Sequence, residues 1–291
     1  MTKTEGTFKQ MKIGHTGITW GYDLNSVEQA VKDVAELGYA AFETFGWIIE
    51  PYEQNTPGGF KGLLDKYGIP LGSVYCNTDF VDPADARADI EQVMRWARLA
   101  KTLGAQTLVL QGAGKRPPAG YDYSGLAAAF SEIGRRAQDM GLLAAIHPHT
   151  GTLIETQEEI RAVMDAIDPT AVFFAPDTGQ IVKGGSDIMQ VLAEYGELVR
   201  HVHLKDYIGG PVERDAEGKE IDKSGYAGYT PVGHGALDMK AIFEFLGQIN
   251  FSQWVMVELD ATPRAPRPPR EAAEMSKRYL EETLGQTFIK R

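Results

Sequence analysis

The chain has 291 residues, of which 43% are hydrophobic and 24% charged, and its formal net charge is −11. These proportions are those of a globular protein with a full core, and no apolar run approaches the roughly 18 residues that a membrane-spanning helix needs. Nucleic-acid-binding proteins usually carry a basic face, so the acidic balance argues against such a partner. We therefore expect a small-molecule ligand, and neither nucleic acid nor membrane as a partner.

The start of the chain and its cysteine content indicate a compartment. Residues 1–10 are polar and lack the apolar core and cleavage site of a secretory signal, which predicts a flexible lead-in before one domain over residues 11–291. Cys76 is the sole cysteine, so no intramolecular disulfide can form, and a lone cysteine in an apolar strand usually serves core packing. Both observations fit a cytoplasmic protein.

Apolar runs of strand length alternate with longer segments of helical period, which is typical of repeated βα units around a parallel sheet. Eight strands are predicted, over residues 12–20, 40–45, 71–76, 107–111, 143–148, 172–176, 199–205 and 254–259. The clearest helices are 26–37, capped by Ser26 and ended by Gly38; 59–67, closed by Gly68; a long helix opened by Asp82-Pro83 and ending at 103–104; 123–140; and 270–284.

Eight such pairs within one chain of this length predict an α/β protein with a single-domain (β/α)8 TIM barrel. An open doubly wound sheet, the alternative, usually has five or six strands. The connection over residues 206–235 is unusually long and carries Tyr226 and Tyr229. A loop of that length is usually a lid or a disordered segment, so we expect a lid-like insertion there.

Two histidines end the fifth predicted strand. His147 and His149 stand two residues apart, a spacing that turns both side chains toward the same side of a strand. His201 and His203 repeat this spacing on the seventh strand, and the other two histidines, His15 and His234, also lie at or just beyond the ends of apolar runs. All six are expected near the carboxyl ends of the strands, where a TIM barrel has its active site.

Further polar side chains share this place. They are Trp20 after strand one, Glu43 on two, Gln111 on four, Asp177 on six, Lys205 and Asp206 on seven, and Glu258 and Asp260 on eight. Imidazole and carboxylate donors together favour a borderline divalent metal, with Mn2+ or Co2+ preferred and Zn2+, Fe2+ or Mg2+ as alternatives. Because only the outermost inward residue of each strand can reach a shared ion, we expect the ion between strands five to eight.

Each of these residues also has an ordinary structural explanation. Asp177 caps a following turn in one interpretation, and Lys205-Asp206 is either a structural ion pair or part of the acid and base machinery. Glu43 is either a substrate contact or a partner for a buried basic group. Glu258 differs, because an unpaired carboxylate inside an apolar strand is costly, which favours a functional role. The glycine-rich segment 111–114 lacks the dinucleotide fingerprint, so no nucleotide cofactor is expected.

These strand-end motifs resemble those of the xylose-isomerase-like barrels of the sugar isomerase and epimerase superfamily, and within it the inosose dehydratases. The resemblance spans nearly the whole chain and rests on Ile13-Gly14 with Trp20, Phe42-Glu43, residues 147–152, Asp177-Thr178-Gly179, residues 201–206 and residues 254–258. It implies a divalent ion held by a Glu, Asp, His, Glu quartet on strands five to eight, and subunits that form homo-oligomers.

Carried over position by position, Asp177, His203 and Glu258 match the last three ligands. His147 stands where the epimerases place a glutamate, a departure that is similar to the dehydratases and leaves the fourth ligand open between His147 and His149. Gln180 stands where the dehydratase pattern usually shows a histidine. Substrate contacts are expected from His15, Trp20, Glu43, Gln111, Gln180 and His234.

The chemistry follows from a metal that binds a ketone and its neighbouring hydroxyl, because it acidifies the α C–H bond and stabilises the enediolate. Protonation of the β-hydroxyl then expels water, whereas return of the proton isomerises or epimerises the sugar. We expect His149 or Glu258 as the base, and Lys205, His15 or His234 as the acid. Since a histidine replaces one of the two epimerase carboxylates, a lyase acting on a keto-cyclitol or keto-sugar is favoured over an isomerase or epimerase.

Two other functions remain as alternatives. A 3-keto-glycoside would lose its aglycone by the same β-elimination, and a non-catalytic sugar-binding subunit would keep the barrel and the pocket without turnover. Exchange of the substrate α-proton with deuterated solvent separates an enzyme from a binding module. An endonuclease is disfavoured by the acidic charge.

Overall fold

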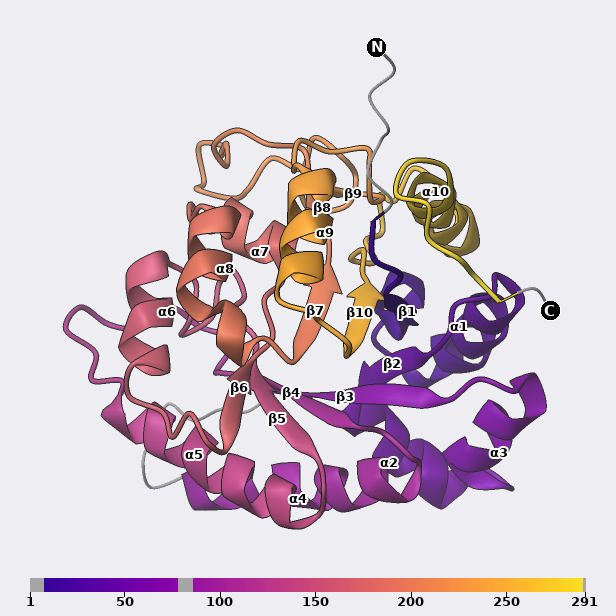
Figure 1. The fold of residues 1–291 in the computed structure, drawn as a ribbon, viewed down its shortest axis with the longest axis horizontal. Coiled ribbons are helices and arrows are strands. Elements are labelled where there is room, and N and C mark those ends of the chain that lie inside the picture. The colour runs from indigo at the N-terminus through magenta and orange to yellow at the C-terminus, as the bar shows by residue number, and fades with distance from the viewer. Residues whose placement is uncertain (1–7, 78–85, 290–291) are drawn as a thin grey trace.

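Eight parallel strands form the wall of a barrel and helices surround it (Figure 1). The computed structural model describes residues 8–77 and 86–289. The strands of the wall are β1 (Lys12–Thr16), β2 (Phe42–Phe45), β3 (Leu71–Asn77), β4 (Thr107–Gln111), β5 (Leu143–Ile146), β6 (Val172–Phe174), β7 (His201–Leu204) and β10 (Trp254–Val257). They pair in the order β6-β5-β4-β3-β2-β1-β10-β7, and parallel bridges from Phe174 to Val199 and from Asp177 to His203 join the two ends. The predicted TIM barrel is confirmed.

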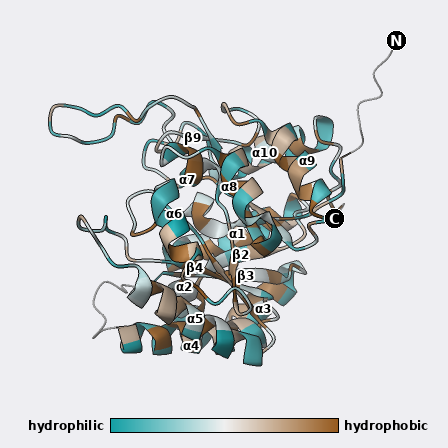
Figure 2. Cartoon of the chain, turned by 60° about the vertical axis from the view of Figure 1, so that its left-hand side comes forward, coloured by the Kyte–Doolittle hydropathy of each residue, from teal (hydrophilic) through white to brown (hydrophobic). Residues whose placement is uncertain are grey.

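The helices cover the outside of this wall. They are α1 (Leu24–Glu36), α2 (Gly46–Asn55), α3 (Gly59–Tyr67), α4 (Ala86–Thr102), α5 (Ser124–Asp139), α6 (Gln157–Met164), α7 (Thr178–Lys183), α8 (Ile188–Tyr195), α9 (Met239–Gln248) and α10 (Pro269–Glu282). Figure 2 shows apolar and polar residues alternating along outer helices such as α4 and α5. Their apolar stripes pack on the strands, which are buried on both faces and therefore read as continuous apolar runs such as Leu108–Leu110.

The connection after β1 differs from its prediction. The strand predicted over residues 12–20 ends at Thr16, and Gly17–Trp20 forms a 3-10 helix. The Thr19 hydroxyl donates to the carbonyl oxygen of Leu259 at 2.7 Å, a contact with the far end of the chain that favours a turn over continued strand. A pairing between residues this distant is invisible to a local pattern.

Two helix predictions also need correction. Asp23, and not Ser26, caps α1, because its carboxylate accepts the backbone N–H groups of Asn25 and Ser26 at 2.9 and 3.2 Å. The helix α2 was not predicted, since it contains Pro51, which removes a backbone donor, and lacks a side-chain cap. The expected start of the fourth helix at Asp82-Pro83 and residues 1–7 of the lead-in lie outside the described residues.

The long connection over residues 206–235 is tied down at its base. It contains a short antiparallel pair, β8 (Asp206–Tyr207) with β9 (Tyr229–Thr230), and forms the orange loop at the top of Figure 1. The buried Asp206 carboxylate accepts the N–H groups of Tyr207, Gly233 and Gly235 at 2.9 Å and of Leu237 at 3.2 Å. One carboxylate therefore fixes both ends of the connection, and its predicted role as a lid stays a prediction.

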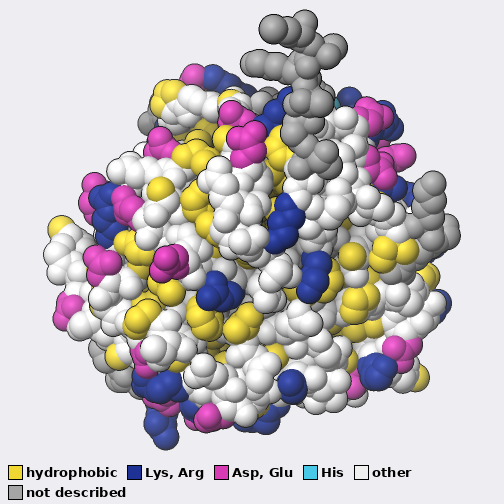
Figure 3. All heavy atoms as spheres, in the orientation of Figure 1, with side chains coloured by type: hydrophobic (Ala, Val, Ile, Leu, Met, Phe, Trp, Pro, Cys, Tyr) yellow, Lys and Arg dark blue, Asp and Glu magenta, His cyan; other side chains and the backbone are white. Residues whose placement is uncertain are grey.

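The outer surface mixes both signs of charge. On the face in Figure 3, acidic and basic side chains lie interspersed among polar and apolar ones. None of the helices in the described ranges is both long enough and apolar enough to cross a membrane.

We predict that Asp206→Ala lowers the free energy of unfolding by about 3 kcal/mol and speeds amide hydrogen exchange across residues 207–237, because four backbone N–H groups lose one buried, charged acceptor. Urea denaturation and exchange mass spectrometry measure the two effects. Asp206→Asn, which keeps one acceptor oxygen, should lose less, and Asp215→Ala at the exposed loop tip should change little. Unchanged exchange in Asp206→Ala would contradict the anchoring role.

Candidate active site

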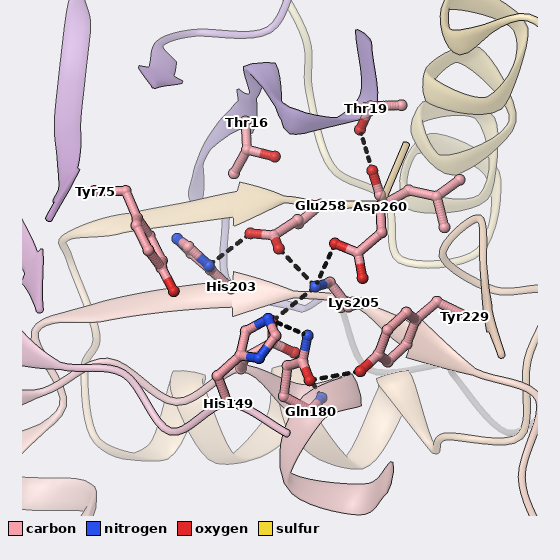
Figure 4. A network of polar contacts seen from close by, with 12 residues as sticks. Thr16, Thr19, Tyr75, His149, Gln180, His203, Lys205, Tyr229, Glu258 and Asp260 are labelled. Atoms are coloured by element: carbon pink, nitrogen blue, oxygen red, sulfur yellow. Dashed lines mark hydrogen bonds and ion pairs between the residues drawn. The ribbon is translucent and has the colours of Figure 1, made fainter. Parts of the chain in front are cut away.

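The strand-end side chains converge at the carboxyl end of the barrel (Figure 4). His203 lies between two carboxylates: its Nε2 is 2.7 Å from Glu43 Oε1 and its Nδ1 is 2.6 Å from Glu258 Oε2. The other Glu43 oxygen lies 2.9 Å from His201 Nε2 and accepts a hydrogen bond from Ser73. Burial opposes charge here, yet the two carboxylates raise the pKa of His203 well above its usual value. Burial likewise opposes the charge of Glu43, but His203 and His201 hold its pKa at about 2.

Glu43 thus serves as a partner for buried imidazoles, the second of its two predicted interpretations. Its carboxylate also borders the cavity described below, so a contact with substrate stays a prediction. A carboxylate behind a histidine is the usual outer partner of a metal-binding imidazole, because it fixes the ring orientation.

Lys205 is a fully buried ammonium surrounded by carboxylates. Its Nζ lies 2.6 Å from Glu258 Oε1, 3.2 Å from Asp260 Oδ1 and 3.3 Å from Asp177 Oδ2, and the Tyr229 ring lies 4.7 Å from it. Burial alone would lower the pKa of Lys205, but these carboxylates raise it well above its usual value. Lys205 does not pair with Asp206, whose oxygens accept loop N–H groups, so the Lys205-Asp206 ion pair predicted as one option is wrong.

His149 belongs to a separate hydrogen-bonded chain. Its Nδ1–H donates to the carbonyl oxygen of Thr150 at 2.7 Å, which leaves Nε2 to accept from the Gln180 amide at 2.8 Å. Gln180 Oε1 in turn accepts from the Tyr229 hydroxyl at 2.5 Å and from the Thr150 hydroxyl at 2.6 Å. These bonds together fix one tautomer of His149 and one orientation of the Gln180 amide.

The residues predicted to hold a metal fit one. His147, Asp177 and His203 each place a ligand atom within 4.8 Å of the other two, and all three side chains are buried. Both ring nitrogens of His147 are buried with no hydrogen-bond partner among the described residues. Asp177 Oδ2 lies 3.3 Å from Lys205 Nζ, and both nitrogens of His203 lie beside carboxylates. Burial and the nearby His203 lower the pKa of His147 well below its usual value, which keeps the imidazole in the neutral form that a ligand requires.

Asp177 and Glu258 also contact residues around this group. Asp177 Oδ1 accepts the backbone N–H of Gln180 at 2.9 Å and caps α7, as one of its two interpretations predicts, and its role as a metal ligand stays a prediction. Glu258 touches His203 but does not belong to the group, so its role as a ligand, like the choice between His147 and His149, also stays a prediction. A second group, Glu43 with His201 and His203, also places its ligand atoms within 4.8 Å of one another.

A cavity of about 320 Å³ opens beside this cluster. Its described lining residues are Thr16, Gly17, Ile18, Tyr22, Glu43, Thr44, Phe45, Trp47, Tyr75, Asn77, Gln111, His149, Glu258 and Asp260. The volume falls within the range of about 300–1,000 Å³ typical of small-molecule sites. Gln111, His149 and Glu258 are thus brought together as predicted, whereas none of the described lining residues comes from the 206–235 connection.

Three residues that were predicted to contact the substrate lie outside this cavity lining. His15 is buried against Tyr39 and Trp20 with its Nδ1–H on the Thr16 carbonyl at 2.8 Å, and burial lowers its pKa to about 4. Trp20 donates its indole N–H to Asp33 at 2.9 Å. His234 is exposed in the turn that Asp206 holds. None of the three lines the cavity within the described part of the chain.

The cavity also contains residues that were not predicted as site residues. Tyr75 lies within β3, donates to Gln111 and stacks on the His203 ring with centroids 6.1 Å apart. Asp260 was placed at a strand end without a role, and Tyr22, Phe45 and Trp47 were not singled out as ligand contacts. In the sequence these residues share only one feature: each is an aromatic or acidic residue at or just after the end of an apolar run. This feature is too common to identify site residues.

Comparison with known proteins agrees with this architecture. Residues 31–282 match the model of the xylose isomerase-like TIM barrel family, and the chain belongs to that family. An inosose dehydratase from Geobacillus kaustophilus (strain HTA426) is 27% identical over 301 residues, covering 95% of this chain and 96% of the relative. These relatives in sequence are inosose dehydratases, which agrees with a sugar-modifying enzyme of this family.

Two solved structures share the fold. The IOLI protein with a bound zinc atom superposes with a TM-score of 0.74 at 17% identity, over 94% of this chain and 98% of that one. A probable 3-DHS dehydratase, AsbF from Bacillus anthracis, gives a TM-score of 0.74 at 14% identity, over 94% of this chain and all of that one. Both likenesses show the fold, and a bound metal in this chain stays a prediction.

We predict that Lys205→Met lowers the free energy of unfolding by about 3–5 kcal/mol, because Asp177, Glu258 and Asp260 lose their buried counterion. Part of the loss should return when Mn2+ or Zn2+ is added, since a divalent ion supplies positive charge at the same carboxylates. Urea denaturation with and without ion measures both.

Lys223→Met is the matched control, because Lys223 pairs with Glu213 where the two side chains are 50% and 54% exposed. Removing an exposed pair should change stability by less than about 1 kcal/mol. Equal losses in the two variants would rule out the counterion role of Lys205.

Proposed function

We propose that this chain is a divalent-metal-dependent carbon–oxygen lyase that removes water, or another β-leaving group, from a keto-cyclitol or keto-sugar. The observation that carries the proposal is the buried group His147, Asp177 and His203, in which both ring nitrogens of His147 have no hydrogen-bond partner among the described residues. The group lies beside carboxylates that both line the cavity and contact a buried lysine. The likeness to inosose dehydratases over 95% of the chain supports a keto-cyclitol such as 2-keto-myo-inositol as the substrate to test first.

His147, Asp177, His203 and Glu258 would hold the ion, which would supply Lewis-acid polarisation of the substrate ketone. Glu43 orients His203, and Ser73 and His201 complete the bonding of Glu43. The neutral state of His147 and the fixed ring of His203 prepare the ligands before substrate arrives. Mn2+ or Co2+ is the proposed ion, with zinc as the alternative that the IOLI structure supports.

The base is Glu258 in this proposal. Its carboxylate lines the cavity, and Lys205 and His203 outweigh the effect of burial and lower the pKa of Glu258 well below its usual value, so it is ionised. His149 also lines the cavity, but its Nε2 already accepts from Gln180 and is free to take a proton only if that bond breaks. We therefore assign His149, with Gln180, to substrate contact and orientation.

The acid is Lys205, acting through Asp260. Lys205 is fully buried and does not itself line the cavity, whereas Asp260 lines it and lies 3.2 Å from the ammonium. A proton passes from Lys205 through Asp260 to the departing hydroxyl, while the C–H electron pair forms the new double bond. Expulsion of the β-oxygen then needs no second carboxylate on the opposite substrate face.

An isomerase or epimerase is the second candidate, since it would begin with the same proton abstraction. The replacement of a strand-five glutamate by His147 argues against it, because a neutral, buried imidazole does not return a proton to the other face. We also propose that Gln111 and Gln180 contact the substrate. The proposal further includes homo-oligomers and a cytoplasmic location.

The deciding experiment measures metal content and then incubates the protein with 2-keto-myo-inositol in deuterated buffer, with and without chelator. We expect loss of one water from the substrate, seen by mass and ultraviolet absorbance, that disappears with chelator and returns with Mn2+ or Co2+. Deuterium uptake without loss of water would favour the isomerase or epimerase. Purified protein that binds no divalent ion would overturn the mechanism.

We predict that Glu258→Gln lowers kcat by about 10²–10⁴-fold, as expected for loss of a general base. His149→Ala should mainly raise KM and leave kcat within about tenfold, because its ring contacts and orients substrate in this proposal. Steady-state kinetics, with metal content measured for each variant, separate the roles. The reverse pattern, with kcat lost in His149→Ala and retained in Glu258→Gln, would exchange the two assignments.

A further inference from the structure

Part of the cavity wall is aromatic. Tyr22, Phe45 and Trp47 form what we call the aromatic platform: the Phe45 and Trp47 rings stack with centroids 4.2 Å apart at 14°, and Tyr22 lies 6.1 Å from Phe45 at 17°. All three line the cavity, and Tyr75 meets Phe45 edge-on at 5.7 Å. Three nearly parallel rings therefore face the space beside the catalytic carboxylates.

The platform is held rigidly from behind. Trp47 packs on Trp96 with ring centroids 6.4 Å apart, and the Trp96 indole N–H donates to Glu50 at 2.9 Å. Gly46, at the start of α2, lies so close that a Cβ atom there would sit 2.2 Å from the Trp96 ring. The missing side chain at Gly46 lets α2 approach Trp96 and sets the position of Trp47.

The outer ring of the platform is left open. Tyr22 is 50% exposed, although its neighbours in the stack are buried or half-buried. An exposed ring that continues a stack at the rim of a cavity is a surface for ligand contact. Flat aromatic groups are the ligands that such a surface takes, because offset-stacked rings attract one another beyond the area that they bury.

Polar side chains line the same cavity. Gln111, His149, Glu258 and Asp260 are among them, and they suit the hydroxyl and keto groups of a single sugar or cyclitol ring. The cavity therefore offers polar groups to a polyhydroxylated ring and, in addition, a set of stacked aromatic rings to a flat group.

We infer that the substrate carries a second, aromatic ring: it is a keto-sugar glycoside whose phenolic aglycone stacks on the aromatic platform. The inference rests on the proposed β-elimination and changes its leaving group. The base removes the α C–H proton, that electron pair forms the C=C bond, and the bond from carbon to the aglycone oxygen breaks. The oxygen keeps the bonding pair and takes a proton, so the products are a phenol and an unsaturated keto-sugar, and no oxidant is consumed.

Binding tests the platform without turnover. Phenyl β-D-glucoside and methyl β-D-glucoside, which lack the ketone and cannot react, are titrated by calorimetry into the metal-loaded protein. We expect the phenyl compound to bind about two- to tenfold tighter, and Tyr22→Ala and Trp47→Ala to remove this difference. Trp47→Phe should retain it, and Tyr67→Ala, on α3 and outside the cavity lining, should leave it unchanged. Equal binding of the two glucosides by the wild type would overturn the inference.

Turnover tests the leaving group. The p-nitrophenyl and methyl 3-keto-glucosides are compared in each variant, because nitrophenolate leaves more readily than methoxide even without the platform. We expect the aryl-to-methyl ratio of kcat/KM to fall about two- to tenfold in Tyr22→Ala, whose exposed site tolerates truncation, and not in Tyr67→Ala. An unchanged ratio with active enzyme would refute the inference alone. Failure with both glucosides and with 2-keto-myo-inositol would refute the proposed function, while the binding comparison would still decide the platform.

Discussion

A buried set of charges at one end of the barrel constrains everything around it. Lys205, Asp177 and Glu258 are almost wholly removed from water, and an isolated charge in that position would be very costly. Each charge is tolerated because another lies within about hydrogen-bonding distance, and the arrangement needs residues from β7, β10 and the end of β6 at once. The barrel must therefore close before the site exists, and the site in turn penalises any structure in which one strand is misplaced.

This dependence explains why the outer partners are as buried as the inner ones. Glu43 comes from β2, on the other side of β1 and β10 from β7, yet it reaches His201 and His203 across the barrel interior. The contact fixes the imidazole of His203 through Nε2, while Nδ1 lies beside Glu258. Asp206 has a comparable role in the long connection, because its carboxylate accepts the N–H groups of Gly233 and Gly235 and so holds that segment beside the end of β7.

The sequence was sufficient for the barrel because parallel strands buried on both faces produce apolar runs, and their polar ends stand out. The pairs His147 with His149 and His201 with His203 predicted a site for this reason. The sequence was insufficient where contacts between distant residues determine the structure. The turn after β1 is held by the Leu259 carbonyl. His15 and Trp20 follow a strand end as predicted, but His15 packs on Tyr39 and Trp20 donates to Asp33. Strand-end position places a residue near the mouth of the barrel, and only packing determines whether it faces inward.

The aromatic residues of the cavity could not be predicted from the sequence either. Phe45 and Trp47 look like core residues in the sequence, and Phe45 is in fact 7% exposed. What makes them a ligand surface is the course of α2, which begins at Gly46 because Trp96 leaves no room for a side chain there. A close approach between α2 and α4 thus shapes the aromatic part of the cavity wall. Electrostatic pairing sets the polar lining and ring packing sets the aromatic lining, so a substrate that uses both combines a polyhydroxylated ring with an aromatic ring that can stack.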